Sequence, residues 1–269
     1  ESIKEEQTVK IINPLSNDLS IMRKSLLFSG LEAIAYNVNR KRQNLKLFEF
    51  GKSYHLFNEK QIENKHLTLF LTGNKNDDNW TTPAQKTSFY TLKSNVESIL
   101  ERLGITNTTS TLSKNDEFSE GLTLKFQKID LVNFGVVKKS ILKKFDIKNE
   151  VLYADFKWDA ILEFTENKEL KYKEISKFPE VKRDFALLLN DEVNFKDIYD
   201  IAFETEKSLL KEVSLFDVYT GSKLPKGKKS YAVSFTLKSE NSTLTDKQIE
   251  KIMNKFQEKF ETKLGAELR

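Results

Sequence analysis

The sequence predicts an α+β protein with two domains, each built on an antiparallel sheet. In residues 1–165, predicted strands outnumber predicted helices and follow one another mostly as hairpins. A charged and polar stretch, residues 166–175, then forms the predicted linker. Residues 176–269 follow with the order β-α-β-β-α-β, which is the order of the ferredoxin-like fold.

The elements of the first domain are marked by apolar periodicity and by turn residues. A short strand is predicted at residues 9–12, and Ser20 is the predicted cap of a helix over residues 20–39. A second helix, residues 89–103, ends at Gly104. The remaining predicted elements are strands at residues 45–50, 67–72, 123–127, 131–137 and 151–156 and a short helix at residues 158–162.

In the second domain, the strand at residues 230–237 has the clearest alternation, with Tyr231, Val233, Phe235 and Leu237 on one face. Because the two helices cover one face of such a sheet, the other face stays open, which is typical of platforms for single-stranded nucleic acid. The other predicted elements are strands at residues 183–189, 213–219 and 267–269, helices from residue 194 or 195 to 209 and after the Thr245 cap, and a basic hairpin loop at residues 222–228.

Composition excludes several classes of function. None of the 269 residues is cysteine, which rules out disulfides, thiolate zinc sites and a cysteine nucleophile, and favours a reducing, cytoplasmic location. No apolar run approaches the roughly 20 residues needed to span a bilayer, so no membrane partner is expected. A formal charge of +4 permits a polyanionic partner without requiring one.

No catalytic or metal site is predicted for this chain. It contains neither a glycine-rich phosphate loop nor a G-x-S-x-G nucleophile motif. His55 and His66 are the only histidines, and without cysteines or HExxH spacing they are interpreted as two surface residues.

The first half of the chain contains the runs NPLSNDLSIMRKSLLFSGLEAIAYNVNR and LKLFEFGKSYH. Both resemble the catalytic-like domain of one known family, the bacterial phenylalanyl-tRNA synthetase β subunit. Its ferredoxin-fold anticodon-binding domain is similar to the runs FPEVKRDFALLLN, LFDVYTGSKLPKGKKSYAVSFTL and STLTDKQIE and to the terminal GAELR. The resemblance covers nearly the whole chain.

This resemblance implies a class II synthetase-like, non-catalytic sheet domain at residues 1–165 and an anticodon-binding domain at residues 176–269. The chain would be the C-terminal part of the β subunit. It would bind tRNA-Phe and dock on the catalytic α subunit in an (αβ)2 tetramer, supporting ATP-dependent attachment of phenylalanine to tRNA. ATP and Mg²⁺ would act in the α subunit and not in this chain. In agreement, Glu49 lacks the arginine two positions before it that the class II Arg-x-Glu element requires; Leu47 stands there.

The predicted anticodon site lies in the run LFDVYTG. Asp217 and Tyr219 are two residues apart on a strand and face one side, while Phe216 and Val218 should point toward the helices. Tyr219 can stack on a base, and Asp217 can accept hydrogen bonds from the N1–H and N2–H₂ groups of guanine. The resemblance implies that Asp217, Tyr219 and Ser230 contact the first anticodon base. Without it, Asp217 and Tyr219 are ordinary solvent-facing residues.

Four lysines crowd the adjoining loop. They can neutralise phosphates of the anticodon loop, or simply keep a hairpin soluble. These residues are Lys223, Lys226, Lys228 and Lys229.

The predicted subunit interface lies on the helix at residues 20–39. The resemblance places the contact with the α subunit on this segment, with Met22, Arg23, Leu26 and Leu27 as candidates. An apolar stripe of this kind is equally expected of an ordinary core.

Two other functions fit the residues. The first is a stand-alone RNA-binding and interaction protein with no ligase role. The second is an enzyme with an unrecognised site, which a cleft holding strongly perturbed carboxylates would indicate.

Overall fold

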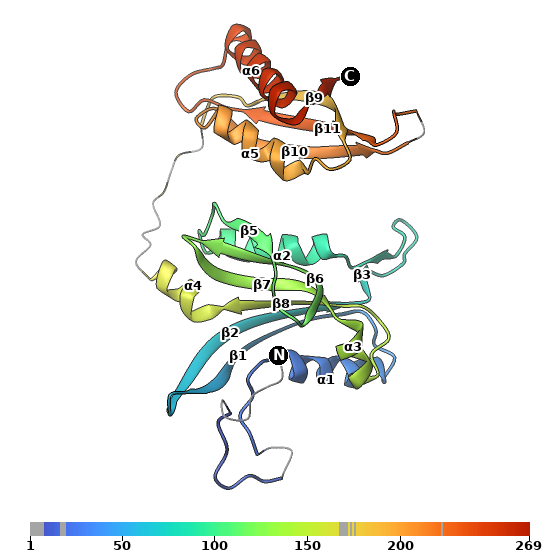
Figure 1. The fold of residues 1–269 in the computed structure, drawn as a ribbon, viewed down its shortest axis with the longest axis vertical. Coiled ribbons are helices and arrows are strands. Elements are labelled where there is room, and N and C mark those ends of the chain that lie inside the picture. Colours follow the sequence, from blue (N-terminus) through green and yellow to red (C-terminus); the bar gives the residue numbers. More distant parts are fainter. Residues whose placement is uncertain (1–7, 17–19, 167–171, 173, 175, 222) are drawn as a thin grey trace. The chain divides into compact units, whose positions relative to one another are not determined.

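The computed structural model describes the whole chain except residues 1–7, 17–19, 167–171, 173, 175 and 222. Its contacts divide it into two compact units, Glu1–Leu170 and Lys171–Arg269 (Figure 1). The division falls inside the predicted linker, residues 166–175. Each unit has its own core.

A six-stranded antiparallel sheet forms the centre of the first unit, with strand order β1-β2-β8-β7-β6-β5. Its strands are β1 (Leu45–Phe57), β2 (Lys60–Thr72), β5 (Thr109–Leu112), β6 (Phe118–Phe126), β7 (Ile129–Val137) and β8 (Val151–Lys157). A separate two-stranded sheet pairs β3 (Asn74–Asn76) with β4 (Gln85–Lys86).

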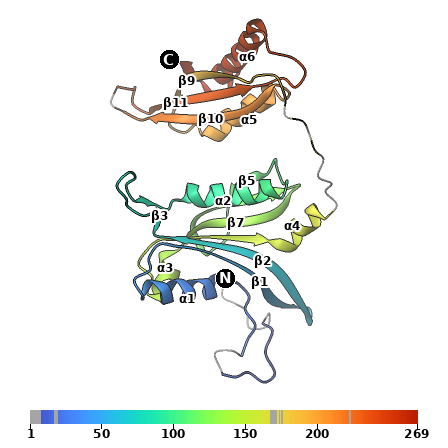
Figure 2. The ribbon, with the colours of Figure 1, turned by 180° about the vertical axis from the view of Figure 1, so that it is seen from behind.

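Helices lie on both faces of the large sheet. As Figures 1 and 2 show, α1 (Leu27–Val38) and α2 (Phe89–Arg102) lie on opposite sides of it. Leu92, Val96 and Leu100 of α2 and Ile161 of α4 (Trp158–Thr165) bury their side chains in one core. The other core holds α1 with Leu142 of the short α3 (Lys139–Leu142), which continues into the 3-10 turn η3 (Lys143–Phe145).

The prediction that the first helix begins at Ser20 is wrong, because α1 begins at Leu27. The carbonyl of Ser20 instead accepts a hydrogen bond from the amide of Ile11, and the amide of Met22 donates to the carbonyl of Val9. The segment before α1 is therefore extended and pairs with the chain near residues 9–11.

The β1–β2 hairpin is longer than predicted. Residues 51–66, read from the sequence as a polar turn, continue both strands up to a tight turn at Asn58 and Glu59, which have φ of 48° and 62°. Positive φ at both central residues suits the twist of a two-residue hairpin turn. The distal part of the hairpin is mostly exposed, so it lacks the apolar alternation that marks a half-buried strand.

The second unit has the predicted ferredoxin-like order. Its sheet runs β10-β11-β9-β12, and all neighbours are antiparallel. The elements are β9 (Val181–Asn190), α5 (Phe195–Thr205), β10 (Leu210–Tyr219), β11 (Lys228–Leu237), α6 (Asp246–Leu264) and β12 (Glu267–Leu268).

The predicted cap of α6 is confirmed, because Thr245 and Gln248 form a capping box. The helix α5 ends earlier than predicted, at Thr205. The Glu206 carboxylate accepts hydrogen bonds from the amides of Ser208 and Leu209, which turns the chain into β10.

One core lies between this sheet and its two helices. Phe235 of β11 is fully buried against Phe185 of β9 and against Phe256 and Phe260 of α6. Val233 faces the same core. Residues that pair across strands share a face, so this core assigns the face of every residue paired with β11.

The substitution Gly30→Ala is expected to destabilise the first unit by about 1–3 kcal/mol, because it overpacks the core. Alanine normally favours a helix interior by about 1 kcal/mol over glycine. Here a Cβ would lie 2.0 Å from Cζ of Phe70, whose side chain is itself buried and cannot swing away. Urea unfolding of the full chain measures the change.

Glu32→Ala is the control, since Glu32 is exposed on the same helix. Adding Phe70→Leu to Gly30→Ala should recover part of the lost stability. A Gly30→Ala chain as stable as the native one would contradict this account of the α1 packing.

Candidate functional site

The candidate nucleic-acid interface is the sheet face of the second unit that points away from the core. Asp217 pairs with Ala232 and Tyr219 pairs with Ser230 across β10 and β11. These partners alternate with Tyr231 and Val233, which belong to the core side. Asp217, Tyr219 and Ser230 therefore lie together on the open face.

A β-bulge interrupts the alternation predicted for this strand. Leu215 pairs with Val233 while Asp217 pairs with the adjacent Ala232, which leaves Phe216 without a cross-strand partner. Phe216 is 59% exposed and Val218 is 48% exposed. Val218 pairs with Tyr231 of the core side and therefore points toward the helix side, as predicted, but it is not buried there. The last four residues of β10 extend beyond the core, which the residue pattern did not indicate.

The Asp217 carboxylate is available to a ligand. It is exposed, and no described residue pairs with it or donates a hydrogen bond to it. Its neighbours across the sheet are Ala232 and, on β9, Ala186. Both of these neighbouring side chains are small.

The side chains of Tyr219 and Ser230 differ in their exposure to solvent. The Tyr219 side chain is 38% exposed and its hydroxyl end lies against the backbone of Gly221. Ser230 is only 8% exposed, so its hydroxyl can contribute only to a base that approaches closely.

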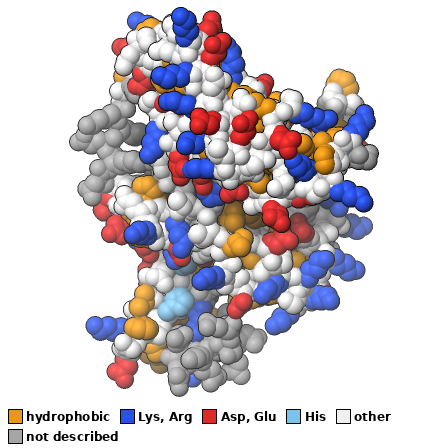
Figure 3. Space-filling view, turned by 45° about the horizontal axis from the view of Figure 1, so that its top comes forward, with side chains coloured by type: hydrophobic (Ala, Val, Ile, Leu, Met, Phe, Trp, Pro, Cys, Tyr) orange, Lys and Arg blue, Asp and Glu red, His pale blue; other side chains and the backbone are white. Residues whose placement is uncertain are grey.

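The four predicted lysines divide into two pairs. Lys223 and Lys226 are exposed in the loop. Lys228 forms an ion pair with Glu267, and Lys229 donates a hydrogen bond to the carbonyl of Asp191 and lies over the Tyr231 ring at 4.9 Å. Lys229 also lies on the core-side face, because its neighbour Ser230 is on the open face. Lysine and acidic side chains are intermixed over the surface in Figure 3.

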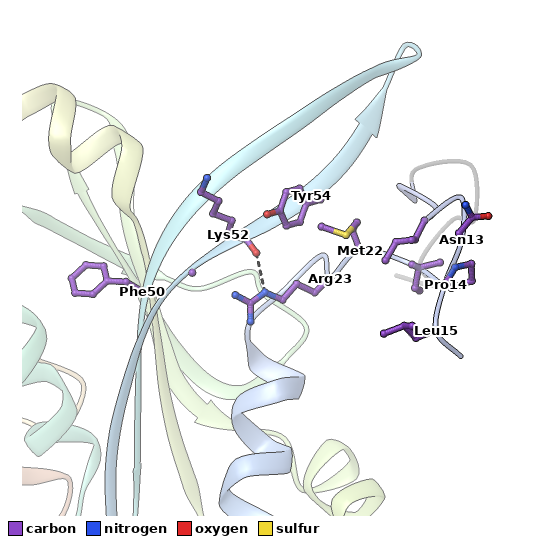
Figure 4. Close-up of a pocket in the computed structure, with 11 residues that line it drawn as sticks. Asn13, Pro14, Leu15, Met22, Arg23, Phe50, Lys52 and Tyr54 are labelled. Atoms are coloured by element: carbon purple, nitrogen blue, oxygen red, sulfur yellow. Dashed lines mark hydrogen bonds between the residues drawn. The ribbon is translucent and has the colours of Figure 1, made fainter. Parts of the chain in front are cut away.

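A groove of about 840 Å³ lies in the first unit between β1 and the segment before α1 (Figure 4). Arg23 crosses it, donating hydrogen bonds from Nε to the carbonyl of Lys52 at 3.0 Å and from Nη1 to Glu49 at 2.7 Å. Met22 lines the groove and is half-buried.

The other two predicted interface residues lie inside the unit. Leu26 is 1% exposed and Leu27 is fully buried, so both pack within the chain's own core. Sequence reasoning missed Phe48 and Phe50 of the edge strand β1, which are 68% and 57% exposed. Phe50 packs edge-on against Trp158 at 5.0 Å. The sequence signal that could have identified them is their spacing, since two aromatic residues two positions apart on a strand lie on the same face.

The prediction of two surface histidines is wrong for His66, whose side chain is 14% exposed. Its Nδ1 lies 2.7 Å from Asp155 and its Nε2 lies 2.8 Å from the Ser53 hydroxyl. This Ser-His-Asp sequence of contacts resembles that of hydrolases. However, Ser53 is fully buried and also contacts His55 at 3.1 Å, so no substrate carbonyl can reach it.

Two acidic groups of the first unit have raised pKa values. Burial raises the pKa of Glu117, although a hydrogen bond from Asn115 at 3.0 Å partly opposes this. Burial and the nearby Asp155 carboxylate raise the pKa of the Tyr153 phenol well above its usual value.

The described part of the chain has neither a metal-binding cluster nor a membrane-spanning helix. These residues contain no group of three His, Cys, Asp or Glu side chains placed to hold a metal ion. No helix among them is both long enough and apolar enough to cross a membrane.

Comparison with known families defines first the class of protein. Residues 176–269 match the family described as ferredoxin-fold anticodon binding domain, which gives the class of domain to which the second unit belongs. Residues 1–158, more than half of the chain, match the phenylalanyl tRNA synthetase beta chain CLM domain. The chain therefore belongs to the phenylalanyl-tRNA synthetase β chain family. The resemblance and fold class predicted from the sequence are confirmed.

Curated relatives agree with this family. The phenylalanine–tRNA ligase β subunits of Bacteroides fragilis and Bacteroides thetaiotaomicron are 49% and 47% identical over all of this chain and 34% of their own length. That of Porphyromonas gingivalis is 41% identical over 98% of the chain and 34% of its own length. The chain thus spans about a third of the length of these relatives.

Among solved structures, the pyrrolysyl-tRNA synthetase of Desulfitobacterium hafniense has a TM-score of 0.46 and 13% identity. The match covers 62% of this chain and 58% of that one.

Glu117→Gln is expected to stabilise the chain at pH 7 and to have no effect near pH 4. Because the folded-state pKa of Glu117 is raised, the folded protein keeps this proton to higher pH than the unfolded chain. The stability from that proton is present below the unfolded pKa and is lost as pH rises through the folded one. Urea unfolding at both pH values measures the difference.

Glu120→Gln is the matched control, since it makes the same charge change at an exposed position on β6. Equal effects of the two substitutions at pH 7 would show that net charge, and not burial of Glu117, determines the stability.

Proposed function

We propose that this chain binds the anticodon of tRNA-Phe and docks on the catalytic α subunit of a phenylalanine–tRNA ligase. The observation that carries the proposal is the exposed Asp217–Tyr219 pair on the open face of a ferredoxin-fold anticodon-binding domain. The relatives' name, phenylalanine–tRNA ligase β subunit, supports the same assignment.

The platform reads guanine at the first anticodon position. The Asp217 carboxylate accepts hydrogen bonds from N1–H and N2–H₂, a pair of donors on one edge that other standard bases lack. Tyr219 stacks on the ring, which contributes about 1–3 kcal/mol per base. The small side chains of Ala232 and Ala186 let the base lie close to the sheet.

Phosphate contacts add affinity without adding specificity. Lys223 and Lys226 are the two loop lysines that are exposed and therefore the better candidates. Lys228 first has to release Glu267, and Lys229 lies on the other face of the sheet. Binding should weaken with salt, because each neutralised phosphate releases counterions.

The chemistry takes place in the α subunit. ATP with Mg²⁺ activates phenylalanine there, and the product is transferred to tRNA. Adenylation depends on positioned arginines, carboxylates and metal ions. The first unit instead uses Arg23 and Glu49 to pair with each other and Asp155 to hold His66. We place the assembly, an (αβ)2 tetramer, in the cytoplasm.

The docking surface for the α subunit is the β1 edge of the first unit. Phe48 and Phe50 expose a contiguous aromatic surface, with ring centroids 6.3 Å apart. Met22 and Arg23 line the groove on the opposite face of β1, where Arg23 pairs with Glu49 (Figure 4). Exposed aromatic patches next to polar residues are the usual centre of a protein interface.

Binding of a tRNA-Phe anticodon stem-loop tests the platform. Tyr219→Ala should weaken binding by about 1–3 kcal/mol through lost stacking. Asp217→Asn should remove the preference for guanine over other bases at the first position, because an amide presents a donor where the carboxylate accepts. Fluorescence anisotropy at low and moderate salt measures both effects.

The matched control is Asp184→Asn, since Asp184 is an exposed acid on the same sheet face, paired with Ser234. It should leave the guanine preference unchanged. Tight binding that ignores the base and both substitutions would contradict the site and assign the affinity to the lysines.

Association with the α subunit tests the docking surface. The double substitution Phe48→Ala and Phe50→Ala should weaken the complex at least about tenfold, since buried aromatic anchors commonly contribute more than 1 kcal/mol each. Biolayer interferometry with the purified α subunit measures the dissociation constant.

Trp80→Ala is the control, because Trp80 is 96% exposed in a loop outside this surface. Undiminished association of the double variant would exclude the β1 edge as the docking surface.

A further inference from the structure

Tyr219 is held by a contact that only glycine permits. A Cβ built on Gly221 would lie 2.2 Å from Oη, 2.3 Å from Cζ and 2.8 Å from Cε2 of Tyr219. The hydroxyl end of the ring therefore lies directly on the backbone two residues further along. Gly221 has no positive φ, so a turn conformation does not explain the glycine.

This contact matters because Tyr219 lies where little else restrains it. It is the last residue of β10, and all of the last four positions of this strand are exposed. An exposed aromatic at a strand end normally occupies several rotamers. Fixing such a side chain when a ligand binds costs affinity, and a ring that is already fixed avoids that cost.

We infer that Gly221 is a positioning residue for Tyr219, which it holds in the orientation that stacks on the anticodon base. The inference rests on the proposed function, and it adds a determinant of affinity that never touches the RNA. The glycine supplies a flat backbone surface for one end of the ring and leaves the rest of the ring to the base.

A substitution at Gly221 should move the ring without unfolding the domain. The atoms in the way are the far end of a side chain that is 38% exposed, so the ring can swing into solvent. Gly30 is the opposite case, because the ring that it meets is buried. Gly221→Ala therefore separates positioning from folding.

The test is a double-mutant cycle on the full chain with the tRNA-Phe anticodon stem-loop. Dissociation constants are measured for the native chain, Gly221→Ala, Tyr219→Ala and the double variant. Gly221→Ala should weaken binding about 2- to 12-fold in the native background, the equivalent of immobilising one side chain. It should have no effect once Tyr219 is alanine.

A spectroscopic readout follows the ring itself. The chain has eight tyrosines, so the ring signal of Tyr219 in a ¹³C-tyrosine NMR spectrum is assigned by its loss in Tyr219→Ala. Gly221→Ala should shift this signal in the free protein. Glu192→Ala is the control on the neighbouring turn, since Glu192 is exposed, and it should leave the signal in place.

These measurements distinguish the role of Gly221 from the binding platform itself. If Tyr219→Ala weakens binding and Gly221→Ala neither weakens it nor shifts the ring signal, the inference is overturned and the platform stands. Equal effects of Gly221→Ala in both backgrounds also overturn it, because the loop then acts without Tyr219. If Tyr219→Ala itself leaves binding unchanged, the platform fails and the inference fails with it.

Discussion

The pairing of β11 with its two neighbours is the constraint on which the candidate interface depends. Phe235 and Val233 are fully buried against the helices, which fixes the face of every second residue of β11. A shift of one residue would turn all of these side chains over. The buried core thus determines that Ser230 and Ala232 face outward, and with them their partners Tyr219 and Asp217.

The bulge divides β10 into a part that packs against the core and a part that is exposed. Before it, Val213 and Leu215 pack against the core. After it, the strand continues beyond the helices and presents exposed residues at every position. A strand that is buried at one end and free at the other gives a rigid support to the side chains of the proposed interface.

The first unit uses its charged and polar side chains for contacts within the unit. Its polar residues satisfy one another: Asp155 holds His66, His66 contacts Ser53, and Arg23 pairs with Glu49. Groups engaged in this way stabilise a sheet and are not free to bind a nucleotide. Phe48 and Phe50 at the β1 edge are among the large apolar side chains that this unit leaves exposed.

The sequence by itself determined the family, the two-domain order, the α6 cap and the candidates Asp217 and Tyr219, because each depends on local spacing or on long ordered runs. Only the tertiary structure decided which candidates are accessible. From the sequence alone, Leu26 and Leu27 cannot be distinguished from interface residues, but the structure shows both to be buried in the core. Likewise, Lys229 cannot be distinguished from Lys223 by sequence, but its strand pairing places it on the other face of the sheet. The bulge, the His66 contacts and the Tyr219–Gly221 contact have no local signature. Burial and cross-strand register depend on contacts between residues far apart in the chain and on backbone geometry. The spacing of residues along the sequence contains no information about either.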